Sequence, residues 1–559
     1  MQRAARWMLL AAASVAVGCR PPRTVGRVRF VNRPPVWVVN DREHVAKRPQ
    51  ELKQLVLLDH LDAVIFQRIP YLLAMHPRLR ARAVNSVDDV PDSTWFTNRI
   101  GRRALRPAAL ARGPNRLPPA DQRLPLTVLS TKVGGGSVGF IVADNSGVRY
   151  LLKFDTKGAP ERETGADVIV QRILWACGYN VPEDDVIHLR AEDLKLAANA
   201  KIKDVFGKPR PMTQRDLDVA LGKIDVGGDG RIRALASRFL SGKLLGGFPM
   251  LGVREGDPND RVPHQHRRDV RGQRALFAWL NHNDVKEDNT LDMYVRDPAD
   301  PARKYVVHYL IDFGQAIGTR GAARRRDVGF ARYEDLQWAL PSLLSLGIWV
   351  RPWERLERPA IHGVGLWSAA SYHPDSWEPS KDYWPFHEAD RFDGFWAAKL
   401  IARFSPAHLE QAVRAARYSD AAAIAKIVEV LRQRARLTIA PYFERVSPLD
   451  GFRVADGERL CFSDLAIEHG YAAAEKTRYA LRAYDERARE LPAPQLAASA
   501  ARGRGQRCVS PLPRSPSADG YLIVQVVAQR DSKALPPLDV HLARAPKDGR
   551  LRVIGLWRH

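Results

Sequence analysis

The sequence predicts an α+β protein with two lobes, followed by a small β unit. Residues 126–153 contain three short apolar strands separated by glycine-containing turns, which is typical of an antiparallel sheet. In the second half of the chain, apolar residues recur at helical spacing, most clearly in 268–282 and 424–435. Residues 521–528 and 551–557 are again strand-like. We therefore expect a first lobe built on an antiparallel sheet, a mostly helical second lobe and a small C-terminal β appendage.

The most specific pattern in the chain is a polar octet followed by a second acidic motif. Residues 282–289 spell HNDVKEDN and fill every fixed position of the template H-x-D-x-K-x-x-N. After a strand-like stretch, Asp312 begins a D-F-G triplet. The alternative is a polar loop that spells the octet by chance, because short motifs carry a real risk of false matches. The two motifs in this order favour a shared site.

The residue types in these motifs suit phosphoryl transfer. That reaction leaves the protein little covalent work, so its tasks are to position a hydroxyl nucleophile and to neutralise phosphate charge. Asp284 is the candidate base, and Lys286 is the candidate cation over the transferred group. Asn289 and Asp312 offer the hard oxygen ligands that Mg²⁺ or Mn²⁺ prefers. We expect the residues between Asn289 and Asp312 to form a hairpin that brings these two ligands together.

A candidate phosphate clamp lies N-terminal to these motifs. Gly134, Gly135 and Gly136 form a turn between two predicted strands, where backbone N–H groups can approach a phosphate without an intervening side chain. Lys153 ends the third strand and is the candidate partner of the first phosphates. Taken alone, the turn also fits a flexible hairpin, and the lysine also fits a solvated strand position.

The segment after Lys153 is predicted to be a helix that carries an acid for this lysine. Apolar residues in 165–177 fall on one face, and Gly178 follows the predicted end of the helix. Asp167 and Glu163 lie one turn apart. We favour Asp167 as the partner of Lys153. The alternative is that each acid only complements the helix dipole.

The order of glycine turn, strand lysine, acid helix, polar octet and D-F-G resembles the protein-kinase-like superfamily, in particular an atypical bacterial branch. The layout is similar to that of the persistence-toxin kinases, the spore-coat kinases and the secretory-pathway kinases. Residues 90–99 (VPDSTWFTNR) and 238–243 (RFLSGK) are similar to stretches of uncharacterised bacterial kinase-like lipoproteins. The resemblance spans about residues 30–480 and implies a two-lobed kinase-like fold and nucleotide chemistry. It implies no particular acceptor.

Two departures from the family pattern affect what the resemblance implies. No A-P-E triplet follows the D-F-G, so recognition of a protein peptide in the usual groove is not implied. The glycine turn lacks a full G-x-G-x-x-G-x-V, so we expect the phosphate clamp to be built differently.

The first eighteen residues have the features of a processing segment. Arg3 and Arg6 precede an apolar stretch, residues 7–17, that is too short to span a bilayer. Residues 16–18 and Cys19 resemble a bacterial lipobox, which implies acylation at Cys19 and a durable membrane anchor. We therefore expect an exported protein of the cell envelope, anchored by lipid to a bacterial membrane. An ordinary signal peptide or a short core helix is the alternative.

The composition limits the partners and the cross-links of the chain. The 87 basic and 63 acidic residues give a net charge of +24, but the arginines are scattered, so a nucleic-acid partner is not favoured. Besides Cys19, the cysteines are Cys177, Cys461 and Cys508, which allow at most one disulfide. No C-x-x-C motif occurs, so a structural zinc site is not indicated.

These patterns also predict where the parts of the chain begin and end. The aromatic-rich stretches 338–353 and 367–396 are expected to cover the second lobe, and residues 471–489 are expected to form a helix. The low-complexity composition of 491–519 predicts a linker. The predicted parts are a lipoprotein signal peptide (1–18), a tether and N-terminal extension (19–125), a nucleotide-binding lobe (126–247), a catalytic lobe (248–490), a linker (491–519) and a β appendage (520–559).

The sequence thus predicts a lipid-anchored phosphotransferase that uses ATP and Mg²⁺ or Mn²⁺ and acts on a hydroxyl group of an unknown protein or small molecule. Two alternatives use the same site. One is a catalytically inactive kinase-like binding module on the cell envelope, where ATP is scarce. The other is a transferase that moves AMP instead of phosphate.

Overall fold

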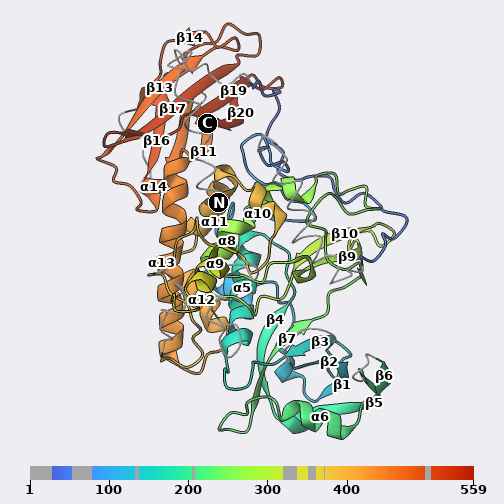
Figure 1. The fold of residues 1–559 in the computed structure, drawn as a ribbon. Coiled ribbons are helices and arrows are strands. Elements are labelled where there is room, and N and C mark those ends of the chain that lie inside the picture. Colours follow the sequence, from blue (N-terminus) through green and yellow to red (C-terminus); the bar gives the residue numbers. More distant parts are fainter. Residues whose placement is uncertain are drawn as a thin grey trace. The chain divides into compact units, whose positions relative to one another are not determined.

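The computed structural model describes residues 28–52, 79–132, 138–203, 208–318, 336–350, 360–370, 372–456, 458–497 and 505–559. Helices and strands are both abundant, so the predicted α+β class is confirmed. The chain divides into two compact units, and many of their elements are labelled in Figure 1. The larger unit comprises Val36–Asn85 and Asp89–Val446, and the smaller comprises Met1–Pro35, Ser86–Asp88 and Ser447–His559.

A seven-stranded sheet forms one part of the larger unit. Its strand order is β4-β7-β3-β2-β1-β5-β6, and every neighbouring pair is antiparallel except β1 with β5. The predominantly antiparallel sheet that the sequence predicts is therefore present. The strands are β1 (Leu126–Thr131), β2 (Gly139–Ala143), β3 (Arg149–Lys153), β4 (Asp184–Leu189), β5 (Leu194–Lys203), β6 (Pro209–Pro211) and β7 (Ile232–Arg238).

Local chemistry sets the turns of this sheet and the helix that follows β3. In the β2–β3 hairpin, Asp144 accepts hydrogen bonds from the N–H groups of Ser146 and Val148, and Gly147 adopts a φ of +80°. The helix α5 (Arg162–Cys177) ends at Gly178, which has a φ of +137°. A Cβ at Gly178 would lie 2.2 Å from the ring of Phe96, so the position requires glycine. The predicted helix 165–177 is thus confirmed.

The rest of the larger unit is mostly helical. The buried guanidinium of Arg434 donates to the carbonyl oxygens of Ala278 and Trp279 at the end of α8, while Trp279 Nε1 donates to Leu431 O. These bonds satisfy helix-end carbonyls that would otherwise be buried without partners. The helices are α4 (Pro107–Arg112), α6 (Gln214–Leu221), α7 (Arg268–Arg271), α8 (Gln273–Leu280), α9 (Leu336–Leu344), α10 (Trp384–Glu388), α11 (Arg391–Ala402), α12 (Pro406–Ala415) and α13 (Ala421–Arg445).

Short elements complete the larger unit. The predicted hairpin between Asn289 and Asp312 is present as β9 and β10, which pair antiparallel. Ser405 caps α12, with Pro406 in the first turn. The remaining elements are the strands β8 (Lys243–Leu244), β9 (Thr290–Arg296) and β10 (Lys304–Leu310) and the 3₁₀ helices η2 (Ala120–Gln122), η3 (Ala191–Asp193), η4 (His264–His266) and η5 (Glu287–Asn289).

The two aromatic-rich stretches of the second lobe differ in burial. In 367–396, the side chains of Trp367, Trp377 and Trp396 are buried, as predicted. In the stretch that contains α9, Leu344 is 76% exposed and Leu346 is 89% exposed, so the prediction that 338–353 covers the lobe is wrong for its described residues. Apolar residues dominate the segment, and its few polar residues, Gln337, Ser342 and Ser345, do not mark a clear polar face, so the sequence does not indicate a buried side.

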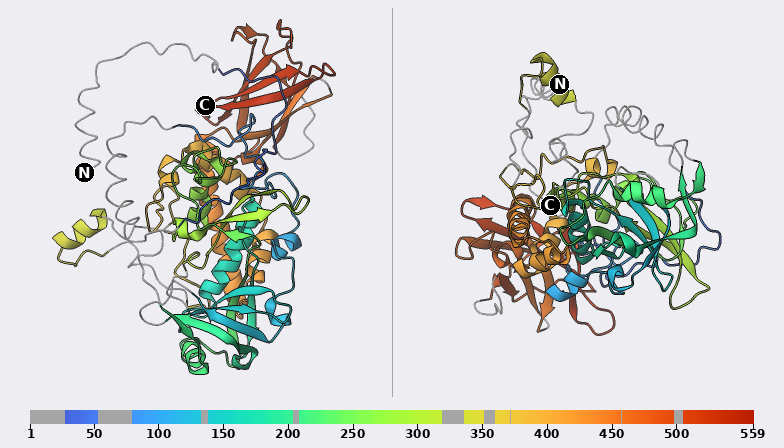
Figure 2. Two further views of the ribbon diagram at one scale, coloured as in Figure 1. Left: turned by 90° about the vertical axis from the view of Figure 1, so that its right-hand side faces the viewer. Right: turned by 90° about the horizontal axis from the view of Figure 1, so that it is seen from below.

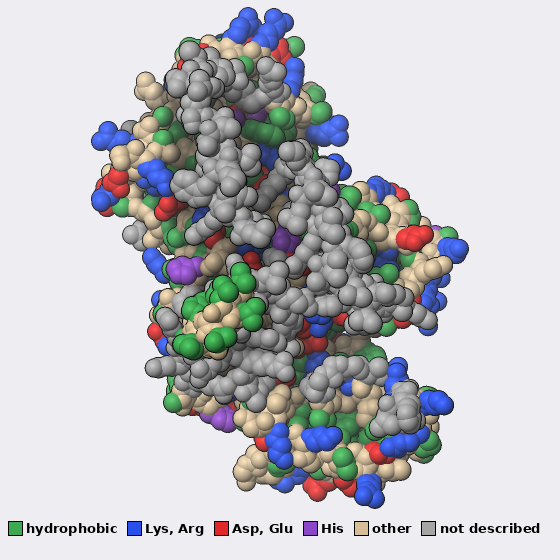
Figure 3. Space-filling model, in the orientation of Figure 1, with side chains coloured by type: hydrophobic (Ala, Val, Ile, Leu, Met, Phe, Trp, Pro, Cys, Tyr) green, Lys and Arg blue, Asp and Glu red, His purple; other side chains and the backbone are tan. Residues whose placement is uncertain are grey.

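Figures 2 and 3 show α9 projecting from the ribbon and hydrophobic side chains gathered on the surface of this segment. Within the described part of the chain, no helix combines the length and the apolar character needed to cross a membrane.

The smaller unit is built from two sheets that share one hydrophobic core. A four-stranded sheet has the order β11-β12-β16-β15, and the other has the order β14-β13-β17-β19-β20, with β18 paired to β17. Phe462 and Val509 of the first sheet pack in the same core as Val524 and Val540 of the second. The elements are β11 (Leu449–Ala455), β12 (Arg459–Asp464), α14 (Leu465–Glu468), β13 (Thr477–Tyr484), β14 (Glu490–Leu491), β15 (Gln495–Leu496), β16 (Gln506–Ser510), β17 (Leu522–Arg530), β18 (Lys533–Ala534), β19 (Leu538–Arg544) and β20 (Leu551–Arg558).

Two sequence predictions fail in this unit. The helix predicted at 471–489 is wrong, because Thr477–Tyr484 forms β13 and pairs with β17. Its Ala and Arg residues favour a helix locally, but most of the strand alternates between half-buried and exposed side chains, with the period of a sheet. The linker predicted at 491–519 contains β15 and β16, so the β unit begins at Ser447 rather than at residue 520.

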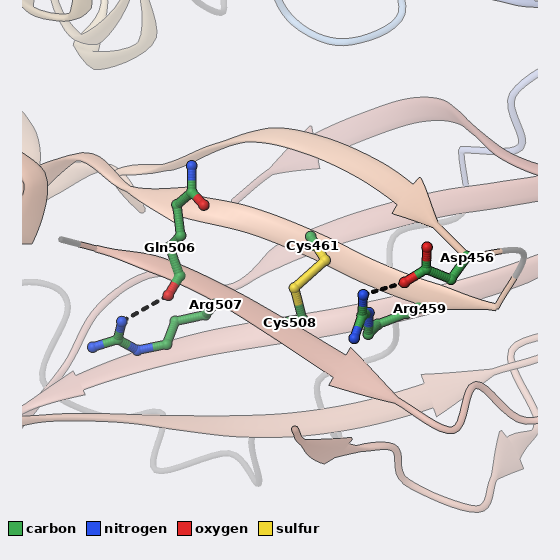
Figure 4. Close-up of a disulfide and its surroundings, with 6 residues drawn as sticks. All are labelled: Asp456, Arg459, Cys461, Gln506, Arg507 and Cys508. Atoms are coloured by element: carbon green, nitrogen blue, oxygen red, sulfur yellow. Dashed lines mark hydrogen bonds and ion pairs between the residues drawn. A yellow bond between two sulfur atoms is a disulfide. The ribbon is translucent and has the colours of Figure 1, made fainter. Parts of the chain in front are cut away.

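A disulfide joins two strands of this unit. Cys461 on β12 lies directly opposite Cys508 on β16, and the two sulfur atoms are bonded (Figure 4). Cys177 is a free, buried thiol. The bridged cysteines are 47 residues apart, and the loop between them includes residues 491–507 of the segment predicted to be a linker. A cross-link of this kind removes conformations from the unfolded chain and thereby stabilises the folded unit.

We predict that the double substitution Cys461→Ala/Cys508→Ala lowers the free energy of unfolding of the smaller unit by about 2–4 kcal/mol, the range typical of a disulfide that closes a loop of this size. Urea titration followed by tryptophan fluorescence measures the effect. Dithiothreitol should destabilise the wild-type chain to the same extent and should leave the double variant unchanged. Equal midpoints for the oxidised and reduced wild-type chains would contradict the bridge.

Candidate active site

Lys153 lies at the centre of a cluster of charged side chains from three distant parts of the larger unit. It ends β3, and its Nζ lies 2.8 Å from Asp312 Oδ1 and 3.7 Å from Asp167 Oδ2. The lysine side chain is 16% exposed, and Asp167 is buried. A lysine in this setting needs carboxylate partners, because an unpaired ammonium is strongly disfavoured away from water. The structure therefore brings these three predicted site residues together.

The two candidate acids in the first two turns of α5 have different observed partners. Asp167 faces Lys153, whereas Glu163 accepts a hydrogen bond from the hydroxyl of Thr156 at 3.3 Å. Asp167, the acid favoured from the sequence, is thus the one that pairs with the lysine.

The polar octet begins where α8 ends. Asn281 adopts a left-handed φ of +50°, which terminates the helix and turns the chain toward the site. His282 is buried, and its ring lies edge-on to Phe277 and to Phe313 of the D-F-G triplet, with centroids 4.7 and 5.7 Å apart. Burial lowers the pKa of His282 to about 4, although Asp284 raises it, so this histidine is neutral at pH 7. It acts as a packing bridge between the two motifs.

The remaining octet residues hold one another in place. Lys286 Nζ lies 2.8 Å from Asp284 Oδ2. The amide nitrogen of Asn289 donates to Asp284 twice, to the main-chain oxygen at 2.7 Å and to Oδ2 at 3.1 Å. The amide oxygen of Asn289 is then the atom that can bind a metal ion. The carboxylate of Asp284 is fixed by two donors from its own loop, which is the preorganisation that a general base needs.

The β9–β10 hairpin connects this loop to Asp312. Thr290 at the start of β9 pairs with Leu310 at the end of β10, and the N–H of Ile311 donates to Asn289 O at 3.0 Å. Asn289 and Asp312 therefore lie at neighbouring strand ends, as the sequence predicts. Asp312 has a φ of +62° and a side chain that is 47% exposed.

The charges around Lys153 shift the pKa values of this cluster in opposite directions. Burial raises the pKa of Asp312, but Lys153 outweighs this effect and the pKa falls to about 2, so the carboxylate is ionised. Burial lowers the pKa of Lys153, but Asp312 and Asp167 together raise it above its usual value. Burial raises the pKa of Asp167 well above its usual value; Lys153 opposes the shift and Asp184 adds to it.

Two charged residues of the cluster, Asp184 and Lys132, were not predicted from the sequence. Asp184, at the start of β4, is buried and hydrogen-bonds to Asp167. Burial raises the pKa of Asp184 to about 6, against the hydrogen bond from Ser237. Lys132 follows β1, and its pKa is lowered by burial and by Lys153. The signals available in the sequence were the acidic run 183–185 and a lysine just before the glycine turn.

Some predicted site residues are not placed. Gly134, Gly135 and Gly136 of the glycine turn lie outside the described residues, as does Cys19. Among the described residues, no group of three or more His, Cys, Asp or Glu side chains is arranged to hold a metal ion.

Comparisons with known proteins give only distant similarities. No protein-family model and no curated protein matches the chain. Similar solved structures include the Golgi casein kinase with Mn/ADP bound, which is 11% identical, covers 57% of this chain and 74% of its own, and has a TM-score of 0.28. The Rio2 kinase–ADP/Mg²⁺–phosphoaspartate complex from Chaetomium thermophilum is 15% identical, covers 55% and 72%, and has a TM-score of 0.20. Values this low carry no argument about function.

We predict that Asp184→Asn removes a pH dependence from the stability of the fold. Because the folded-state pKa of Asp184 is raised to about 6, the folded chain binds its proton more tightly than the unfolded chain, so this group lowers stability as the pH rises from about 4 to about 6. Asparagine cannot titrate. The stability of the variant relative to wild type should therefore increase between pH 4 and pH 7, by up to about 3 kcal/mol, since each pKa unit corresponds to about 1.4 kcal/mol.

Urea titrations at several pH values measure this difference. The exposed Asp218→Asn serves as the matched control and should track wild type across the range. A constant difference between Asp184→Asn and wild type would contradict the proposed environment of Asp184.

Proposed function

We propose that the chain is a lipid-anchored phosphotransferase with a kinase-like two-lobed fold, which uses ATP and Mg²⁺ or Mn²⁺ to phosphorylate a hydroxyl acceptor. The observation that carries the proposal is the joint placement of Lys153, Asp167 and Asp312 beside the Asp284–Asn289 loop. These residues come from three separate segments, yet they form one network through the Ile311–Asn289 hydrogen bond. Phosphoryl transfer needs this combination of a phosphate-binding cation, metal ligands and a positioned base.

The donor set fits a magnesium–nucleotide complex. Asp312 offers an ionised, half-exposed carboxylate, and Asn289 offers an amide oxygen from the adjoining strand end. Magnesium commonly takes one or two protein oxygens and completes its shell with phosphates and water, so a dense cluster of acids is not required. The bound nucleotide would supply the phosphoryl group. Lys153 and Lys132 would neutralise phosphate charge, and Asp167 would orient Lys153.

Asp284 is the proposed base. Its carboxylate is held by Lys286 and Asn289, so it can accept the proton of an acceptor hydroxyl without reorganising. Lys286 lies in the same loop and would also stabilise negative charge on the transferred group.

A separate set of observations supports the proposed location. The leader and Cys19 favour export and acylation. The Cys461–Cys508 bridge supports this proposal, because disulfides persist in oxidising compartments such as the bacterial cell envelope.

We predict that Asp312→Asn weakens Mg-ATP binding at least tenfold, because the variant loses the charged metal ligand and the partner of Lys153. Isothermal titration calorimetry of the full chain gives the affinity. Asp229→Asn, at a position where the side chain is 65% exposed, is the matched control and should stay within twofold of wild type. An unchanged affinity in Asp312→Asn would remove the basis for the site.

We also predict that Asp284→Asn retains Mg-ATP binding but slows transfer by about 10²–10⁴-fold, the range expected for loss of a general base. Self-labelling of the full chain with ATP labelled in the γ-phosphate measures the rate, and mass spectrometry identifies the group transferred. Transfer of AMP would indicate nucleotidyl transfer by the same site. Nucleotide binding by the wild type without transfer to any acceptor tried would indicate the inactive binding module.

A further inference from the structure

A cavity lies in the helical part of the larger unit, outside the cluster around Lys153. Its volume is about 710 Å³, within the usual range for small-molecule sites. Residues from α7, α8, α10, α11 and the C-terminal end of α13 line it, together with Arg80 and the segment that precedes α10. None of its lining residues belongs to the candidate active site. The cavity therefore needs an explanation of its own.

The lining is rich in arginine, and part of the positive charge is already matched by acids. Arg445 forms a two-pronged ion pair with Asp375. The fully buried Arg271 lies 3.5 Å from Glu388 and 3.7 Å from Asp393. These ion pairs connect the cavity walls. They do not include Arg274 and Arg391, which also line the cavity.

Two other arginines of the lining have no carboxylate to themselves. Arg274 donates to the main-chain oxygens of Asp375 at 3.2 Å and Trp377 at 3.5 Å and hydrogen-bonds to Tyr442, and it shares the carboxylate of Asp375 with Arg445. Arg391 is exposed at the cavity, where its guanidinium lies 4.9 Å from the ring centroid of Phe392. A carboxylate that also lines the cavity, Asp390, is engaged in accepting two N–H groups at the start of α11.

The apolar part of the lining is aromatic and largely buried. Trp377, Tyr383, Phe386 and Tyr442 are each less than 8% exposed. Rigid aromatic walls with guanidinium groups at the opening suit an organic molecule that carries a strongly anionic group. Arginine binds phosphate through parallel N–H donors, which makes phosphate a better match than a single carboxylate.

We propose that this cavity binds a small phosphorylated organic anion, with Arg274 and Arg391 contacting its phosphate groups. The site is separate from the proposed nucleotide site, and its binding does not depend on the proposed activity.

The cavity wall also contacts the polar octet. Trp377 Nε1 donates to Asn281 Oδ1 at 3.0 Å, and the N–H of Ser380 donates to Asn283 O at 2.8 Å. Asn281 and Asn283 flank His282, and Asn283 immediately precedes Asp284. A ligand in the cavity that orders residues 377–380 would therefore restrict the motion of the loop that carries Asp284, the proposed base. This consequence, unlike the binding itself, rests on the proposed function.

Inorganic pyrophosphate is a suitable probe, titrated into the full chain by calorimetry in the absence of divalent metal. We expect saturable binding that Arg274→Gln/Arg391→Gln weakens at least tenfold. Because Arg391 is exposed, Arg391→Gln alone should preserve the fold and weaken binding about threefold or more. The matched control is Arg215→Gln, an exposed arginine of α6, which should bind as wild type.

Lys153→Gln separates this cavity from the nucleotide site. Pyrophosphate affinity should stay within threefold of wild type in this variant, even if Mg-ATP binding is lost. The proposal is overturned if the wild type shows no saturable binding, if the arginine variants bind as well as wild type, or if Lys153→Gln abolishes binding. Failure of Mg-ATP binding alone would count against the proposed function and would leave this cavity unaffected.

Discussion

The ion pairs of Lys153 with Asp167 and Asp312 are the constraint on which the candidate site depends. The lysine is fixed by β3 in the middle of a seven-stranded sheet, and the two acids come from α5 and from the turn after β10. Burying such charges is favourable only when they are paired and well placed. The three segments must therefore meet in one arrangement, and that arrangement also sets the position of the loop from Asp284 to Asn289.

The same cluster contains more negative than positive charge close to the lysine. Asp167, Asp184 and Asp312 outnumber the ammonium groups of Lys153 and Lys132, and burial raises the pKa of Asp167 and of Asp184. Only Asp312 is both ionised and substantially exposed. A divalent cation at Asp312 would compensate charge where the network is open to solvent. The buried acids would remain as the support for Lys153.

The sequence was most informative where chemistry and local pattern coincide. The octet, the D-F-G triplet, the lysine at the end of the third strand and the helix with Asp167 are each specified by residues close together in the chain, and the structure places them as neighbours. Asp184 was missed because its role depends on burial beside Asp167, which no local pattern reveals. The segment 477–484 was wrongly predicted because its Ala and Arg residues favour a helix, whereas long-range pairing with β17 selects a strand. The exposure of α9 was missed because a stretch dominated by apolar residues does not indicate which side is buried.

The most direct test of the central claim is the electron paramagnetic resonance spectrum of Mn²⁺ titrated into the full chain with and without ATP. If Asp312, Asn289 and Lys153 together form a metal–nucleotide site, the chain alone should bind Mn²⁺ weakly, and addition of ATP should produce a tightly bound signal distinct from that of free Mn-ATP. A spectrum identical to that of Mn-ATP in buffer, at protein concentrations well above that of the metal, would contradict the account.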